Sequence, residues 1–182
     1  MSFDDFFGRL IAAIERARVD YMLVGSVASI SHGESRSTRD ADVVVALDQA
    51  GAERLIEAFP ADTWYADLDM AREAVVRRRS FNVIDEVTFW KADFIVRPDS
   101  PYDRVAFGRR MQKTVSGVLA WVATPEDTIL GKLRWAIASG GSARQLDDIA
   151  GILRIQGERI DRAYLEQWVP ILGVEAAWRQ VA

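Results

Sequence analysis

The chain has 182 residues, of which 49% are hydrophobic and 27% charged, a composition typical of a globular protein that forms one domain or two small ones. Its net charge of -4 argues against a generally basic nucleic-acid binder but permits a local basic patch, and the absence of cysteine excludes disulfides and thiolate metal sites. No apolar run is long enough to cross a bilayer, and the acidic start MSFDDFFGRL lacks the basic residues of a signal peptide, so we expect a cytoplasmic protein with no membrane partner.

Residues 3–17 are predicted to form an amphipathic helix that covers one face of a sheet. Ser2 and Asp5 have the spacing of a capping pair at its start. The apolar residues recur at helical spacing, and they are Phe3, Phe6, Phe7, Leu10, Ile11 and Ile14. A buried strand, residues 19–24, follows this helix.

Gly25 stops that strand where the chain passes into a helix of residues 26–31. We expect Ser26 to cap this helix, so that the free N–H groups of its first turn attract phosphate. His32 and Gly33 end the helix, Gly33 as a left-handed cap. His32 is the only histidine of the chain, and we expect it to have a structural role without chemistry.

The loop of residues 34–39 leads to two aspartates. Its Arg36 and Arg39 suit phosphate oxygens but equally fit a solvated loop, and Thr38 is expected to fix the backbone before the next strand. Asp40 and Asp42 are two residues apart, so on a strand both project from the same face. Two adjacent carboxylates repel each other unless a cation lies between them, and an oxygen-only pair suits Mg²⁺ better than zinc.

The motif Gly25-Ser26, followed by Arg36-x-Thr38-x-Asp40-x-Asp42, resembles the nucleotidyltransferase superfamily, which includes DNA polymerase beta, and is more closely similar to its bacterial branch of AbiEii-type toxins. The resemblance implies an α+β fold, a mixed β-sheet flanked by helices and followed by a C-terminal helical bundle. It also implies transfer of a nucleoside monophosphate from a nucleoside triphosphate (NTP) to an acceptor hydroxyl, with two Mg²⁺ ions as cofactors. Asp40 and Asp42 would then be catalytic metal ligands, and the residues that contact the NTP would be Gly25, Ser26, Arg36, Thr38 and Arg39.

Helices and strands are predicted to continue between residues 48 and 98. A helix over residues 48–58 ends before Pro60, residues 64–65 form a short strand or turn, and a second helix covers residues 70–79. A hairpin follows, with strands at residues 81–84 and 87–96 and a turn at Asp85-Glu86. In its second strand, Lys91, Asp93 and Ile95 share the face opposite to the apolar one.

Asp93 is a charge inside an otherwise apolar strand. A buried carboxylate requires a cation, a metal or solvent, so Asp93 is either an edge-strand residue that faces water or a metal ligand. In the family that the motif resembles, a third carboxylate comes from a neighbouring strand between two hydrophobic residues, and Ala92-Asp93-Phe94 fits that place. The resemblance therefore implies that Asp93 joins Asp40 and Asp42 as a catalytic metal ligand.

The last third of the chain is predicted to be mainly helical. A helix over residues 102–110 and short strands at residues 114–116 and 118–123 complete a catalytic domain of residues 1–123. A helical domain of residues 124–182 then begins with Thr124 as the cap and Pro125 at the first helical position. Its first helix has a predicted apolar stripe with Lys132 beside it, and the stripe contains Ile129, Leu130, Leu133 and Ile137. Further helices cover about residues 142–155 and follow Asp161.

The resemblance extends to this helical part. Family members carry a lysine on a helix with a similar start and an aspartate on the next helix, which implies that Lys132 contacts the NTP phosphates and that Asp147 or Asp148 supports that site. The alternative is an exposed lysine and an ion pair between Arg144 and Asp148 within one helix.

Three classes of function remain open for the acceptor. RNA, and specifically tRNA, is implied by the toxin branch, together with an antitoxin protein as a partner in a toxin–antitoxin or phage-defence setting. A small molecule of the aminoglycoside type is the second class, and a nucleotide-binding or interaction module without turnover is the third. Net negative charge disfavours a long RNA footprint, but the basic clusters Arg77–Arg79 and Arg109–Lys113 are available to hold an RNA end.

Overall fold

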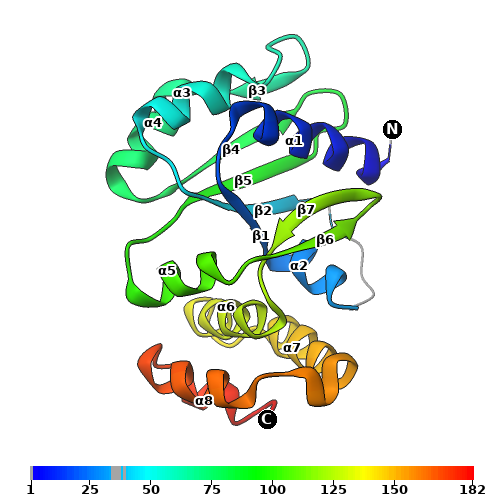
Figure 1. Cartoon of the computed structure of the whole chain (residues 1–182), viewed down its shortest axis with the longest axis vertical. Coiled ribbons are helices and arrows are strands. Elements are labelled where there is room, and N and C mark those ends of the chain that lie inside the picture. Colours follow the sequence, from blue (N-terminus) through cyan, green and yellow to red (C-terminus); the bar gives the residue numbers. More distant parts are fainter. Residues whose placement is uncertain (1, 34–37, 39) are drawn as a thin grey trace.

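The computed structural model describes residues 2–33, 38 and 40–182, and within them a seven-stranded mixed sheet forms the centre (Figure 1). The strand order is β3-β4-β5-β2-β1-β7-β6. The pairs β2–β5 and β1–β7 are parallel, and the other neighbouring pairs are antiparallel. The strands are β1 (Tyr21–Val24), β2 (Asp40–Val45), β3 (Trp64–Ala66), β4 (Ser80–Asp85), β5 (Lys91–Val96), β6 (Met111–Val115) and β7 (Val118–Val122).

Helices lie on both sides of this sheet, as the α+β prediction requires. Figure 1 shows α1, α3 and α4 over one face, with α2, α5, α6, α7 and α8 on the other side. No helix of the described part of the chain is long and apolar enough to cross a membrane. The helices are α1 (Phe3–Ala17), α2 (Gly25–Ser31), α3 (Gln49–Glu57), α4 (Leu68–Arg77), α5 (Pro101–Gly108), α6 (Pro125–Ala138), α7 (Ala143–Gln156), a 3-10 helix η1 (Gly157–Arg159), α8 (Arg162–Ile171) and α9 (Glu175–Trp178).

Alternation along β2 and β5 separates the core from the opposite face of the sheet. Ala41, Val43 and Val45 of β2 are buried in the cluster that α1, α3 and α4 share, and residues 92, 94 and 96 of β5 are buried with them. Because successive strand residues point to opposite faces, residues 40, 42 and 44 of β2 and residues 91, 93 and 95 of β5 face the side of α2, α5 and α6.

A second apolar cluster lies among the C-terminal helices. It joins α5 to α6, α7, α8 and α9, and its buried members include Tyr102, Leu130, Leu133, Ile149 and Leu165. The boundary at residue 124 stays a prediction, since α5 packs with the helices that follow that boundary.

Two of the predicted helix starts are confirmed. The Ser2 Oγ accepts a hydrogen bond from the N–H of Asp5, and the Asp5 carboxylate accepts one from the N–H of Ser2. At α6, the Thr124 Oγ1 accepts the N–H of Asp127 at 3.1 Å, and Pro125 is the first residue of the helix. These bonds satisfy N–H groups that have no partner within a helix.

Three local predictions are wrong. The residue before α2 is Val24, and no side chain caps the helix, so Ser26 is not its cap. Asp85 is not a turn residue: it ends β4, is fully buried, and binds the side chains of Arg9 and Thr88. Ile137, predicted to be buried, is 47% exposed, because the buried stripe of α6 turns toward Ala136 and Lys132 instead.

Candidate active site

The turn from β1 into α2 lies directly against a carboxylate. Gly25 has a φ of +60°, and a Cβ atom on it would lie 2.1 Å from the Oδ2 of Asp42. Only glycine adopts this backbone conformation readily and leaves that space free. The turn at Gly25 is therefore in direct contact with Asp42 of β2.

Asp42 and Asp93 are neighbours across the sheet. They are register partners in the parallel pair β2–β5, and Asp40 is the register partner of Lys91 two residues earlier. The alternation described above places these four side chains on one face. Burial first, and then the negative charges of Asp93 and Asp40, raise the pKa of Asp42 to about 6.

Lys91 is a part of this group to which sequence reasoning assigned no role. Its Nζ lies 2.9 Å from the Oδ2 of Asp93, and this hydrogen bond raises the pKa of Lys91. Strand alternation had already placed Lys91 on the Asp93 face, so the signal was present in the sequence. The lysine provides a positive charge among three carboxylates.

The carboxylate group has the donor chemistry of a hard divalent cation. Asp40, Asp42 and Asp93 offer only oxygen, which Mg²⁺ prefers, and burial together with repulsion from the other two carboxylates raises the pKa of Asp42. Among the described residues, no three His, Cys, Asp or Glu side chains already converge on one metal position. The donor set fits Mg²⁺, with Lys91 holding Asp93 in the structure described here.

Lys132 is buried rather than exposed, which corrects the alternative considered from the sequence. It is 4% exposed, and its Nζ lies 2.6 Å from the Oδ2 of Asp148 on α7 and 3.1 Å from the Oε1 of Gln145. Burial and the neighbouring carboxylates raise the pKa of Asp42, and the positive charge of Lys132 on α6 partly opposes this rise. Of the two predicted aspartates of α7, Asp148 is buried with Lys132 and Asp147 is exposed.

The loop before β2 is described only at Thr38, and Arg36 and Arg39 lie outside the described residues. The Thr38 Oγ1 donates a hydrogen bond to the backbone oxygen of Asp40 at 3.0 Å. This is the local backbone role expected for Thr38.

A cavity of about 400 Å³ lies on the same face of the sheet, lined by residues next to the carboxylates rather than by the carboxylates themselves. Its floor includes Val24, the register partner of Asp42, together with Val44 and Ile95, which follow Asp42 and Asp93 by two residues. Tyr102 of α5 and Trp135 of α6 lie across from this floor. The lining is mainly apolar. The cavity could not be predicted from the sequence because its walls come from segments far apart in the chain.

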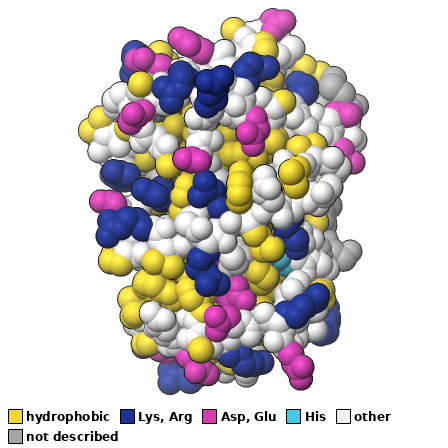
Figure 2. Space-filling model, viewed as in Figure 1, with side chains coloured by type: hydrophobic (Ala, Val, Ile, Leu, Met, Phe, Trp, Pro, Cys, Tyr) yellow, Lys and Arg dark blue, Asp and Glu magenta, His cyan; other side chains and the backbone are white. Residues whose placement is uncertain are grey.

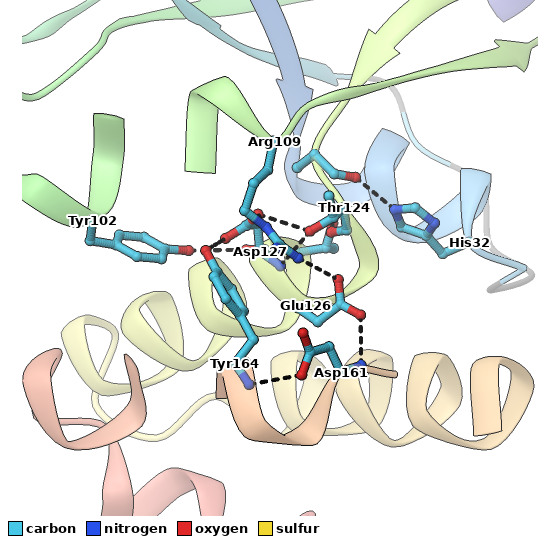
Figure 3. Close-up of polar contacts among 10 residues, drawn as sticks. His32, Tyr102, Arg109, Thr124, Glu126, Asp127, Asp161 and Tyr164 are labelled. Atoms are coloured by element: carbon cyan, nitrogen blue, oxygen red, sulfur yellow. Dashed lines mark hydrogen bonds and ion pairs between the residues drawn. The ribbon is translucent and has the colours of Figure 1, made fainter. Parts of the chain in front are cut away.

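Asp127 joins the sheet half of the chain to its C-terminal helices (Figure 3). Its carboxylate accepts hydrogen bonds from the hydroxyl of Tyr164 at 2.7 Å, the hydroxyl of Thr124 at 2.8 Å and the Nε of Arg109 at 3.4 Å. The neighbouring Glu126 accepts the N–H of Asp161 at 3.0 Å, which holds the start of α8. The Pro-Glu-Asp start of α6 thus has a structural role.

The basic cluster Arg109–Lys113 makes contacts within the protein, and its use on RNA stays a prediction. Arg109 also lies over the ring of Tyr164, Arg110 pairs with Asp20 at 3.0 Å, and Lys113 donates to the backbone oxygen of Ser31. On the face shown in Figure 2, basic side chains are interspersed with acidic ones and do not form one continuous basic patch.

His32 has the structural role that the sequence predicted. It is 1% exposed, its Nε2 lies 2.8 Å from the backbone oxygen of Ala123, and its Nδ1 lies 3.2 Å from the Nζ of Lys113. Burial lowers the pKa of His32 to about 4. The neutral ring can therefore donate to Ala123 and accept from Lys113.

Comparison with known proteins identifies the fold. Neither a family model nor a curated protein matches the sequence. The structure is similar to that of the antibiotic-resistance factor ANT(2'')-Ia, with a TM-score of 0.59 and 14% identity over 97% of this chain and 91% of that one. It is also similar to a nucleotidyltransferase-like antigenic protein from Paracoccidioides brasiliensis, with a TM-score of 0.51 and 14% identity over 94% and 91% of the two chains. These likenesses show a nucleotidyltransferase-like fold, while a particular kinship with the AbiEii-type branch stays a prediction.

Proposed function

We propose that this chain is a Mg²⁺-dependent nucleotidyltransferase that moves a nucleoside monophosphate from an NTP to an acceptor hydroxyl. The observation that carries the proposal is the cross-strand pairing of Asp42 with Asp93 on the face that also presents Asp40, directly beside the turn at Gly25. Such a carboxylate group can hold the divalent ions of two-metal phosphoryl transfer, and the adjacent glycine turn leaves room for phosphates.

Each group in this site has a proposed task. Gly25 and Ser26 would hold the terminal phosphates of the NTP, and Arg36, Thr38 and Arg39 would border them from the preceding loop. Asp40, Asp42 and Asp93 would hold Mg²⁺, which when bound lowers the pKa of the acceptor hydroxyl and neutralises charge on the phosphates. Lys132, supported by Asp148, would add positive charge beside Asp42.

The transfer is a single in-line displacement. The acceptor oxygen bonds to the α-phosphorus, and the bond from that phosphorus to the bridging oxygen of the β-phosphate breaks. Pyrophosphate leaves with that oxygen, and the hydroxyl proton passes to the carboxylate group. No oxidant or reductant takes part.

A small molecule with a hydroxyl is the acceptor that the structure favours. The cavity of about 400 Å³ beside the carboxylates has the size of a small-ligand site, and the cluster Arg109–Lys113 is occupied by internal contacts. An RNA end is the second candidate, because Arg77 is 56% exposed on α4 and Arg78 and Arg79 follow it on the surface. An antitoxin partner rests on the sequence resemblance alone.

The test is transfer of label from an NTP labelled at its α-phosphate. The wild type and the Asp42→Asn variant would be incubated with Mg²⁺ and, separately, with total tRNA, a protein panel and small hydroxyl compounds that include aminoglycosides. We expect acceptor labelling by the wild type and at least a hundredfold less by the variant. Equal labelling by both proteins would show that the carboxylate group does not catalyse transfer.

A further inference from the structure

The cavity beside the carboxylates is lined by an arginine whose buried Nε has no hydrogen-bond partner. This residue, Arg97, follows β5. Its guanidinium lies over the ring of Phe107, with 5.2 Å from Cζ to the ring centroid. The nearby Asp99 is exposed and pairs with Arg104 at 2.7 Å.

The other charged residues of the cavity wall are already neutralised. Arg134 binds Asp103 at 3.1 Å, and Asp127 is held by Arg109, Thr124 and Tyr164. Among the described lining residues, Arg97 is therefore the cation whose guanidinium has no carboxylate or carbonyl bound to it. A partly buried charge of this kind is stabilised by an anionic or carbonyl group that enters the cavity.

The position of the cavity identifies the side from which its ligand approaches. Gly25 lies beside Asp42, and the cavity extends from Val24, the residue before Gly25, past Val44 and Ile95 to Arg97. In-line displacement requires the leaving pyrophosphate and the attacking hydroxyl on opposite sides of the α-phosphorus. If pyrophosphate leaves at Gly25, a hydroxyl held at the Arg97 end of the cavity would attack from the side opposite to the leaving group.

From these contacts we propose that the cavity binds the acceptor, and that this acceptor is a small, largely apolar hydroxyl compound with an anionic group that pairs with Arg97. This inference rests on the proposed function and names its substrate class. Tyr102 and Trp135 provide aromatic walls for the apolar body, and the guanidinium of Arg97 receives the anion. A polycation such as an aminoglycoside does not fit, because Arg97 repels it and both carboxylates of the wall are occupied.

Binding can be measured without turnover by using anilinonaphthalene sulfonate, a fluorescent dye with an aromatic body and one anionic group. The variants are Arg97→Met, which removes the charge, and Arg97→Lys, which keeps the charge but not the guanidinium plane. Arg104→Met, an exposed arginine that pairs with Asp99, is the matched control. Circular dichroism shows whether each variant is folded.

We expect one dye per chain, binding at least tenfold weaker in Arg97→Met and intermediate in Arg97→Lys, with Arg104→Met equal to the wild type. An aminoglycoside should not displace the dye, and neither should ATP added without metal. Unchanged affinity in a folded Arg97→Met variant overturns the proposal, as does displacement by an aminoglycoside. Displacement by ATP also overturns it, because the cavity would then hold the nucleoside.

The dye experiment can fail without the proposed nucleotidyl transfer being wrong, and the two outcomes are distinguishable. Dye binding involves no transfer, so a negative dye result leaves the labelling by wild type and Asp42→Asn unaffected. The second arm of the test compares labelling of aromatic hydroxy acids with labelling of their uncharged amides. We expect the acids to be labelled at least tenfold faster, and equal rates would contradict the role of Arg97.

Discussion

A Cβ atom on Gly25 would lie 2.1 Å from the Oδ2 of Asp42, so the turn before α2 and the central carboxylate of the site occupy contiguous space. Gly25 also has a φ of +60°, a backbone conformation that residues other than glycine adopt at a cost of about 1 kcal/mol. The glycine is thus required both by its own backbone and by the position of its neighbour.

Gly25→Ala should displace Asp42 as well as strain the turn. We expect a loss of about 1–3 kcal/mol in the free energy of unfolding and at least a tenfold loss of transfer. Urea unfolding and the labelling assay measure the two effects. Gly108→Ala is the control, because a Cβ atom there meets nothing within 4 Å, and it should change stability by less than about 0.5 kcal/mol. Equal behaviour of the two variants would contradict the contact.

Lys132→Met should destabilise the protein strongly, because it leaves the buried Asp148 without the ammonium group 2.6 Å away. Breaking one side of a buried ion pair costs about 3–5 kcal/mol. Urea unfolding of this variant, of Asp148→Asn and of the double variant gives the coupling between the two side chains. Asp147→Asn, at the exposed neighbouring position, should be neutral. A Lys132→Met protein as stable as the wild type would refute the buried pair.

His32 should make stability fall at acid pH. The unfolded chain binds a proton to this ring near the ordinary pKa of about 6.5, whereas burial lowers the folded pKa to about 4. The folded state is therefore destabilised as pH falls from about 6.5 to about 4, by at most about 3 kcal/mol, and this contribution is fully present above that range.

His32→Gln removes the titration while keeping a side-chain N–H for the Ala123 oxygen. The unfolding free energies of the wild type and of His32→Gln would be measured from about pH 4 to about pH 8. Above about pH 6.5, the difference between the two proteins should not change with pH. Below it, the wild type should lose stability faster than the variant. Parallel curves over the whole range would show that His32 does not titrate in this way.

Lys91→Met should strengthen divalent-metal binding. The ammonium group 2.9 Å from Asp93 competes with any cation that approaches this carboxylate, so its removal should tighten Mn²⁺ binding roughly tenfold or more. Electron paramagnetic resonance of free Mn²⁺ measures the affinity. Lys91→Arg, which keeps the charge, and Arg77→Met, which removes an exposed charge from α4, should both bind like the wild type. A Lys91→Met affinity equal to that of the wild type would refute the competition.

Strand periodicity was sufficient to predict which side chains share the site face. The spacing of two between Asp40 and Asp42, and the alternation around Asp93, hold because side chains alternate on any strand. The family resemblance implied that the strands of Asp42 and Asp93 are neighbours, but the sequence could not predict their register, since pairing depends on the whole sheet. The structure supplies that relationship.

Burial of charged residues was the main failure of prediction. Asp85 seemed a turn residue because its partner Arg9 is 76 residues away, and Lys132 was placed outside the apolar stripe because Asp148 lies on another helix. A charged side chain is expected at the surface unless it is paired, and these partners are visible only in three dimensions. For the same reason Arg97 and the cavity were not predicted.

The carboxylates of the site also favour the correct register of β2 against β5 during folding. A shift of β2 by one residue would turn Asp40 and Asp42 into the apolar cluster beneath α1 and α3, and would bring Val43 to the open face. Burying two unpaired carboxylates is far more costly than exposing valine. The charges that form the site therefore penalise the misaligned sheet, so a chain that has folded with β2 shifted by one residue would be unstable as well as inactive.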